Sequence, residues 1–146
     1  MEKVVAHMIE WFERYLTHKD IITKKIEKID KHKDKIVVTY KDKTQTFFIF
    51  PDAGEFDFSL LHNIDNPSIV MLNTEDNLNW TIKNWNYLIS HVKLSLYFIN
   101  PHAGSDTKWI IFPYTHHQIS DSVELGLRSM FESVESTTIE SFSQNI

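Results

Sequence analysis

Cysteine is absent from this chain of 146 residues, and glycine and proline are scarce, with three and four residues. The lack of cysteine excludes disulfides, thiolate zinc sites, iron–sulfur clusters and cysteine nucleophiles. No Gly-rich phosphate loop, dinucleotide-binding fingerprint or Gly-x-Ser-x-Gly elbow occurs. No apolar run approaches the roughly 20 residues that cross a bilayer, and the first residues lack the layout of a signal peptide. We therefore expect a cytoplasmic protein without membrane association.

Charge is present but unevenly distributed. The formal net charge is −5, yet residues 1–43 carry 11 of the 15 basic residues and 8 of the 20 acidic ones. This excess of lysine suggests a phosphate-facing patch, with Lys24, Lys25 and Lys28 as candidate nucleic-acid contacts. The interleaved acids instead favour a solvated face of mixed charge, so nucleic acid is a partner that the charge pattern permits but does not favour.

The first half of the chain alternates between helical and strand patterns. Apolar residues at helical spacing predict an amphipathic helix over residues 3–17. Residues 20–34 fit either a strand or an extension of that helix. Runs of β-branched and aromatic residues over 36–40 and 44–50 predict a hairpin, and the continuous apolar run over 68–72 predicts a central strand buried on both faces.

The second half continues with a helix that Thr74 caps. Its buried stripe consists of Leu78, Ile82, Trp85 and Ile89. Residues 94–99 and 109–112 predict a second hairpin. A last helix follows, and Ser120 or Asp121 is its expected cap.

This order of elements indicates the α/β class, as an α+β mixed single domain whose sheet of about five to six strands is flanked by three helices. The composition supports one core, because 42% of the residues are hydrophobic. We expect the domain to span residues 1–135 and the Ser/Thr-rich residues 136–146 to form a flexible tail.

A helix, a hairpin, an acidic turn, a buried strand, a helix and a further strand follow one another over residues 1–99, and the pair Pro51-Asp52 stands in the acidic turn. This arrangement resembles the core of the restriction-endonuclease-like, PD-(D/E)XK nuclease superfamily, and Pro51-Asp52 matches its first motif. The second motif of that family, an acid-x-lysine triplet, is degenerate here, because Met71-Leu72-Asn73 stands in its place. The resemblance implies either a non-catalytic relative or a metal-dependent protein that processes nucleic acid.

Three carboxylates crowd the connection between the hairpin and the buried strand. Asp52, Glu55 and Asp57 lie within six residues and could hold a divalent cation, Mg²⁺ or Mn²⁺, through oxygen ligands, with Glu75 as an additional ligand in the nuclease hypothesis. No EF-hand pattern supports this site, and solvated acids in a turn are the alternative. Without a complete catalytic motif, an enzymatic activity is not favoured, and no cofactor is expected outside this hypothesis.

Eight histidines include one adjacent pair, His116-His117. On an extended segment adjacent side chains point to opposite sides, so only one of the two could join a metal site with His102, Asp121 or Glu124. A surface segment with one packed histidine is the alternative.

Aromatic residues are abundant, at 13% of the chain. Trp80 and Tyr87 fall off the buried stripe of their predicted helix, and their separation of seven residues places them on one helical face. Exposed aromatic side chains act as anchors at protein interfaces. The sequence thus favours a non-catalytic binding or homo-oligomerising module, with a second copy or another protein on this surface.

Overall fold

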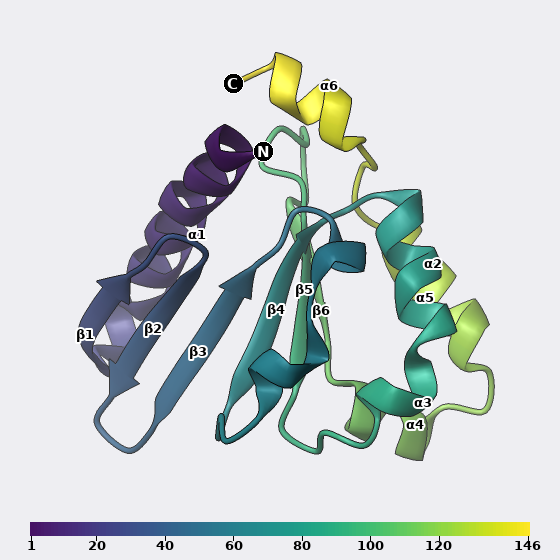
Figure 1. Ribbon diagram of the computed structural model, residues 1–146, viewed down its shortest axis with the longest axis horizontal. Helices are drawn as coiled ribbons and strands as arrows, with labels where there is room; N and C mark the ends of the chain where they lie inside the picture. The colour runs from purple at the N-terminus through teal and green to yellow at the C-terminus, as the bar shows by residue number, and fades with distance from the viewer.

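The computed structural model describes residues 1–146 and contains one sheet of six strands whose spatial order is the order of the chain (Figure 1). The strands are β1 (Ile26–Lys31), β2 (Lys35–Tyr40), β3 (Thr44–Ile49), β4 (Pro67–Leu72), β5 (Ser95–Ile99) and β6 (Lys108–Ile111). The pairs β3–β4 and β4–β5 are parallel, and the other pairs are antiparallel. The predicted class, the mixed sheet and both hairpins are confirmed.

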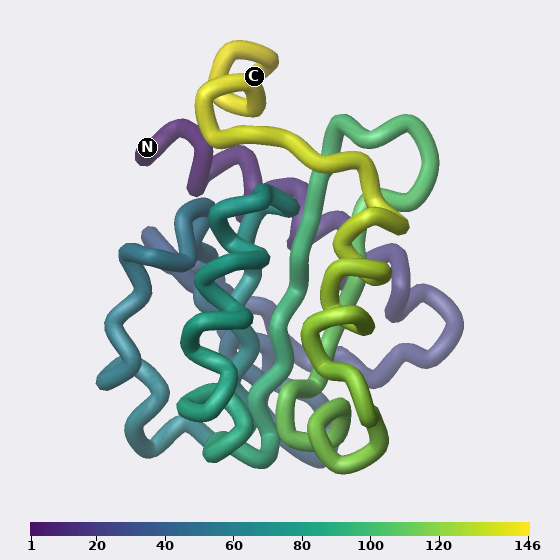
Figure 2. The backbone as a smooth tube through the Cα atoms, turned by 90° about the vertical axis from the view of Figure 1, so that its right-hand side faces the viewer, coloured from purple at the N-terminus to yellow at the C-terminus, as the bar shows by residue number.

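Helices cover both faces of this sheet. They are α1 (Glu2–Thr23), α2 (Glu75–Lys83), α3 (Trp85–Leu88), α4 (Pro113–Ile119), α5 (Val123–Glu132) and α6 (Ile139–Gln144), with short 3-10 turns η1 (Ala53–Glu55) and η2 (Phe58–Leu61). Helix α1 packs on one face, while α2 and α5 lie side by side on the other (Figures 1 and 2). None of the helices has the length and apolarity that a bilayer crossing needs.

The number of helices, six instead of the three expected, reflects one interruption and two added helices, α4 and α6. The helix after Thr74 breaks at Asn84, whose side-chain amide donates to the carbonyl of Trp80 at 2.8 Å. The last predicted helix is likewise preceded by α4, which begins with Pro113 at its first position, where a proline costs no hydrogen bond. The expected cap at Ser120 or Asp121 is therefore wrong: α5 starts one residue later and has no side-chain cap.

Helix α1 extends beyond the predicted helix, and the ambiguous segment after it divides between the end of this helix and β1. The helix closes at Lys24, which adopts a left-handed conformation with φ of 50°. The carboxylate of Asp20 then accepts hydrogen bonds from the backbone N–H groups of Lys25 at 2.8 Å and Ile26 at 3.1 Å. These bonds turn the chain sharply from the helix into the edge strand.

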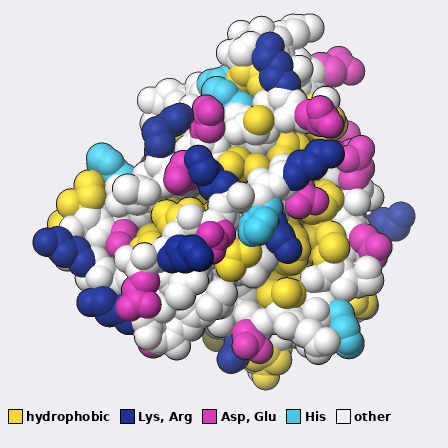
Figure 3. Space-filling model, turned by 60° about the vertical axis from the view of Figure 1, so that its left-hand side comes forward, with side chains coloured by type: hydrophobic (Ala, Val, Ile, Leu, Met, Phe, Trp, Pro, Cys, Tyr) yellow, Lys and Arg dark blue, Asp and Glu magenta, His cyan; other side chains and the backbone are white.

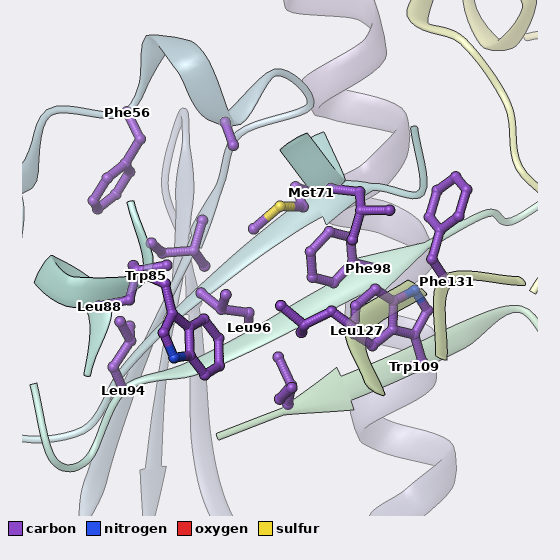
Figure 4. Packing of buried hydrophobic residues seen from close by; sticks show 14 of the residues in the cluster. Phe56, Met71, Trp85, Leu88, Leu94, Leu96, Phe98, Trp109, Leu127 and Phe131 are labelled. Carbon is purple, nitrogen blue, oxygen red and sulfur yellow. The ribbon is translucent and has the colours of Figure 1, made fainter. Parts of the chain in front are cut away.

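Two hydrophobic cores lie on the two faces of the sheet, and β4 is buried along its whole length, as predicted. The larger core lies beneath α2, α3 and α5, and Phe98 stacks there on Trp109 with 4.0 Å between ring centroids (Figure 4). The second core lies beneath α1, where the rings of Phe12, Phe47 and Tyr97 meet. Each face of the sheet thus has an apolar layer of its own.

The chain does not leave the domain after residue 135, which corrects the expected boundary and tail. Helix α6 begins where the hydroxyl of Thr138 accepts from the backbone N–H of Ser141 at 3.1 Å. The side chain of Phe142 is 1% exposed, and its ring packs against His7 and His102. Phe142, with Ile139 and Ile146 packed against the same core, docks this helix beside α1.

Candidate functional site

The break at Asn84 changes how Trp80 and Tyr87 come together. A continuous helix would align them at a distance of two turns, but here they lie on separate helices and meet through a third ring, Phe58 of η2. The centroid of Phe58 lies 5.6 Å from that of Trp80 in a stacked arrangement and 4.3 Å from that of Tyr87. Their proximity is therefore as predicted, but its cause is tertiary packing rather than helical spacing.

We define the aromatic patch as Phe58, Leu60, Trp80 and Tyr87. Tyr87 is 44% exposed and Leu60 is 39% exposed, while the other two side chains are partly buried. Beneath the patch the ring of Phe56 is buried and contacts Phe58 at 5.9 Å. The patch is thus an exposed apolar surface on a rigid base, which is the form of an interface anchor.

The two segments that carry the aromatic patch have exposed charges of opposite sign. The connection that carries Phe58 also carries Glu55 and Asp57, both exposed. The helical side carries Lys83 at the end of α2 and Lys93 after α3, also exposed. Phe58 was missed in the sequence, although its alternation with Phe56 inside an acidic turn is a signal that could have identified it.

The three carboxylates predicted as metal ligands do not converge. Asp52 accepts from the backbone N–H of Gly54 at 2.9 Å, and Asp57 accepts from that of Ser59 at 2.9 Å, so each caps its own turn. This backbone hydrogen bond is the main reason that the pKa of Asp57 lies below its usual range. No three His, Asp or Glu side chains are arranged to hold a metal ion.

Asp52 and Glu75 do line one cavity, of about 480 Å³, beyond the ends of β3 and β4 and beside the start of α6. Asp76 and Glu140 line it too, whereas Glu55 and Asp57 do not. We call this the acidic cavity. Of the four carboxylates in the nuclease hypothesis, only Asp52 and Glu75 line it together.

Asn73, which stands in the position of the second nuclease motif, is buried and holds the fold together. Its side-chain oxygen accepts from the indole N–H of Trp109 at 2.8 Å, and its amide donates to the carbonyls of Val134 at 3.0 Å and Phe131 at 3.3 Å. All of its hydrogen-bonding capacity joins β4 to β6 and to the end of α5. A structural role accounts for the asparagine at this position.

The histidine pair lies on helix α4 and not on an extended segment, which corrects the prediction. The indole N–H of Trp85 donates to Nδ1 of His117 at 3.1 Å. Nε2 of His116 is buried without a partner, next to Gly126, where a Cβ atom would approach it to 3.2 Å. Burial, together with the neighbouring His117, lowers the pKa of His116. The pair packs against α3 and α5, and the expected partner His102 lies elsewhere, against Phe142.

The candidate nucleic-acid contacts are exposed and lie far from the acidic cavity. Lys24 and Lys25 follow the end of α1, and Lys28 on β1 pairs with Asp30 at 3.6 Å. Figure 1 shows the end of α1 at the bottom of the sheet and the start of α2, which borders the cavity, at the top. One phosphate group therefore could not contact both the lysines and the acids.

No protein-family model, no curated protein and no solved structure matches this chain.

Proposed function

We propose that this protein is a non-catalytic binding module that pairs with a second copy of itself through the aromatic patch. The observation that carries the proposal is the meeting of Phe58, Trp80 and Tyr87 on an exposed surface. Aromatic side chains held on a rigid base provide large contact area at low cost in conformational entropy.

The charges beside the patch favour a second copy as its occupant. Glu55 stands three residues before Phe58, and Lys83 stands three residues after Trp80; both are exposed. In a two-fold symmetric dimer the same surface is used by both protomers, so the acidic segment of one can face the basic segment of its partner. This pairing would make the patch self-complementary in charge.

The buried asparagines support the non-catalytic part of the proposal. Asn73 belongs to the segment Met71-Leu72-Asn73 that stands in place of the second nuclease motif, and its side chain is engaged in hydrogen bonds within the chain. The side chain of Asn77, on the following helix, is engaged in the same way. A metal-dependent activity on nucleic acid would have to be built from the acidic cavity alone.

Sedimentation equilibrium tests the proposal by measuring the dimer dissociation constant. We expect Tyr87→Ala and Trp80→Ala each to weaken the dimer by at least about tenfold. Tyr114→Ala is the matched control, because Tyr114 is 37% exposed on α4 outside the patch. A wild-type protein that stays monomeric at its highest soluble concentration contradicts the proposal.

A charge exchange sharpens the test. Lys83→Glu should weaken the dimer, because it places a carboxylate opposite Glu55 of the partner protomer. The double variant Lys83→Glu with Glu55→Lys should restore it. Equal weakening in the single and double variants would rule out this pairing of the two segments.

A further inference from the structure

A second concave surface lies on the opposite face of the sheet from the aromatic patch. It is a groove of about 370 Å³ between the second half of α1 and the ends of β2 and β3 that meet at their turn. Its volume lies in the range of small-molecule sites. The groove shares no residue with the aromatic patch, so inferences about the two are independent.

The floor of the groove contains a tyrosine that the fold leaves without a partner. Tyr97 is only 6% exposed, and its ring packs against Phe12 and Phe47, yet its hydroxyl makes no hydrogen bond within the chain. Tyr40 also lines the groove with a free hydroxyl, and Tyr15 lies beside Tyr97 with 6.5 Å between ring centroids. The hydroxyl groups of Tyr40 and Tyr97 are not buried, because the only buried side-chain polar atom without a partner in the chain is Nε2 of His116. They reach the groove and are free to bond to a ligand there.

The tyrosine hydroxyls act as donors across the physiological range of pH. Burial raises the pKa of Tyr97, and the neighbouring Tyr15 and Tyr40 raise it further. Burial also raises the pKa values of Tyr15 and Tyr40. A phenol that keeps its proton donates a hydrogen bond to an anion and does not repel it.

Lysines surround the opening. Lys19, Lys25 and Lys43 line the groove, and none of them forms a salt bridge. The ammonium group of Lys43 lies 5.5 Å from the ring centroid of Tyr40. On the side of the molecule that carries α1, basic and acidic side chains are interspersed, with apolar side chains exposed between them (Figure 3).

Two carboxylates also border the groove, but one is already engaged. Asp20 accepts hydrogen bonds from the hydroxyl of Thr23 at 3.0 Å and from the backbone N–H groups of Lys25 and Ile26. Partial desolvation opposes ionisation of Asp20, but these hydrogen bonds outweigh it and hold its pKa below the usual range. Asp42 is the second acid. The groove thus has three lysines without salt bridges, while Asp42 is its one carboxylate without hydrogen bonds to the chain.

Apolar side chains complete the lining. Leu16 and Phe47 are buried at the inner wall, and Phe112 reaches the groove from the end of β6 with more than half of its side chain exposed. A ligand held only by charge would not need this surface. The combination of an apolar wall, free phenols and lysines is typical of sites for amphipathic ligands with one charged end.

We propose that this groove binds a small organic anion, whose ring-sized apolar body packs against Leu16 and Phe47 and whose acidic head is held by the hydroxyl groups of Tyr40 and Tyr97 and by the lysines at the opening. Phosphate monoesters and carboxylates share this chemistry. The site is distinct from the acidic cavity, which would repel such a ligand.

A titration followed by ¹H–¹⁵N NMR tests the proposal with phenyl phosphate and phenylacetate as probes. At least one of them should give saturable shifts that cluster on the amides of Lys25, Tyr40, Gln45 and Tyr97. Which of the two binds more tightly distinguishes a phosphate from a carboxylate head. Inorganic phosphate has the acidic head without the ring, and benzyl alcohol has the ring without the charge. Both should bind more weakly. Absence of saturable shifts with both anions overturns the proposal.

Variants then assign the binding to these residues. Tyr97→Phe should weaken binding by about tenfold, because it removes one hydrogen bond to a charged group. Lys25→Ala combined with Lys43→Ala should weaken binding and reduce its salt dependence. Lys83→Ala, on the other face of the sheet, is the control and should leave it unchanged. Unaltered affinity in Tyr97→Phe, with the fold intact by circular dichroism, would contradict the assignment.

Discussion

The acidic cavity beyond the ends of β3 and β4 and the groove beneath α1 differ in what their polar groups do. Four polar side chains that line the cavity bond to the chain itself: Asp52, Thr74, Asn77 and Thr138. In the groove, the hydroxyl groups of Tyr40 and Tyr97 bond to nothing in the chain. Most polar side chains of the larger hollow thus serve the fold, whereas the smaller hollow has phenol groups that are free to bind a ligand. Free hydrogen-bonding capacity indicates a binding site better than volume does.

The largest effect is expected from Asn77→Ala on the structural side of this comparison. Asn77 accepts from the backbone N–H of Ala53 at 2.9 Å and donates to the carbonyls of Pro51 and Leu72, both at 2.8 Å. Removing the amide leaves these buried groups unpaired and should lower the free energy of unfolding by about 3 to 4 kcal/mol. Urea denaturation measures the loss. Asn79→Ala, an exposed change on the same helix, should cost less than about 0.5 kcal/mol.

Phe142→Ala comes next and tests whether the C-terminal helix belongs to the fold. The phenyl ring is buried against His7 and His102, so its removal should cost about 2 to 3 kcal/mol. The cost stays below that of a central core position, because α6 contacts the rest of the fold mainly through α1 and can detach by itself. Hydrogen exchange should show faster exchange in α6, and Ser143→Ala should behave like the wild type. Unchanged exchange would mean that the ring does not hold this helix.

Tyr97→Phe should have a small effect on stability, in contrast to Asn77→Ala. The hydroxyl that it removes has no partner in the chain, so the free energy of unfolding should change by less than about 0.5 kcal/mol. The same urea experiment measures it without ligand. A loss of more than about 1 kcal/mol would show that the hydroxyl is engaged in the fold and would remove the basis of the comparison.

The smallest effect is expected in the pH dependence of stability, to which the unpartnered His116 contributes. Burial lowers the pKa of His116 in the folded protein, and burial together with His102 lowers that of His7. The unfolded chain therefore binds these protons more readily, and stability should fall as the pH drops from about 6.5 through the lowered folded values. Thermal unfolding between about pH 7 and 5 measures this slope. His116→Gln should reduce the slope only in part, since His7 still contributes; an unchanged slope would contradict the role of His116.

Strong local patterns predicted most of the fold correctly. The run over 68–72 became the central buried strand because its four consecutive apolar residues, 69–72, have no solvent-facing alternative in a sheet. The break at Asn84 was not predictable, because the stripe from Leu78 to Ile89 continues through it and the interrupting hydrogen bond goes from a side chain to a carbonyl four residues earlier. Helix α4, which contains His116, was not predicted. Its start signal, Pro113, directly follows the predicted strand over 109–112.

The functional surfaces were harder to predict, because they are assembled from distant segments. Trp80 and Tyr87 were placed together correctly, but Phe58, which joins them, comes from a connection more than 20 residues earlier. The groove draws on residues from Leu16 to Phe112, and of the candidate lysines only Lys25 lines it. Spacing along the chain carries no signal for such a site.

The spatial order of the strands has a consequence for how this chain folds. Because every strand pairs with the strand that precedes it in the sequence, the sheet can grow by one strand at a time from β1 to β6. No strand has to be inserted between two that are already paired, which shortens the loops that must close and favours rapid folding. A chain emerging from the ribosome can therefore build its sheet in the order of synthesis. The contact of Phe142 with His7 forms only after the whole sheet has been made, because α6 follows all six strands in the sequence.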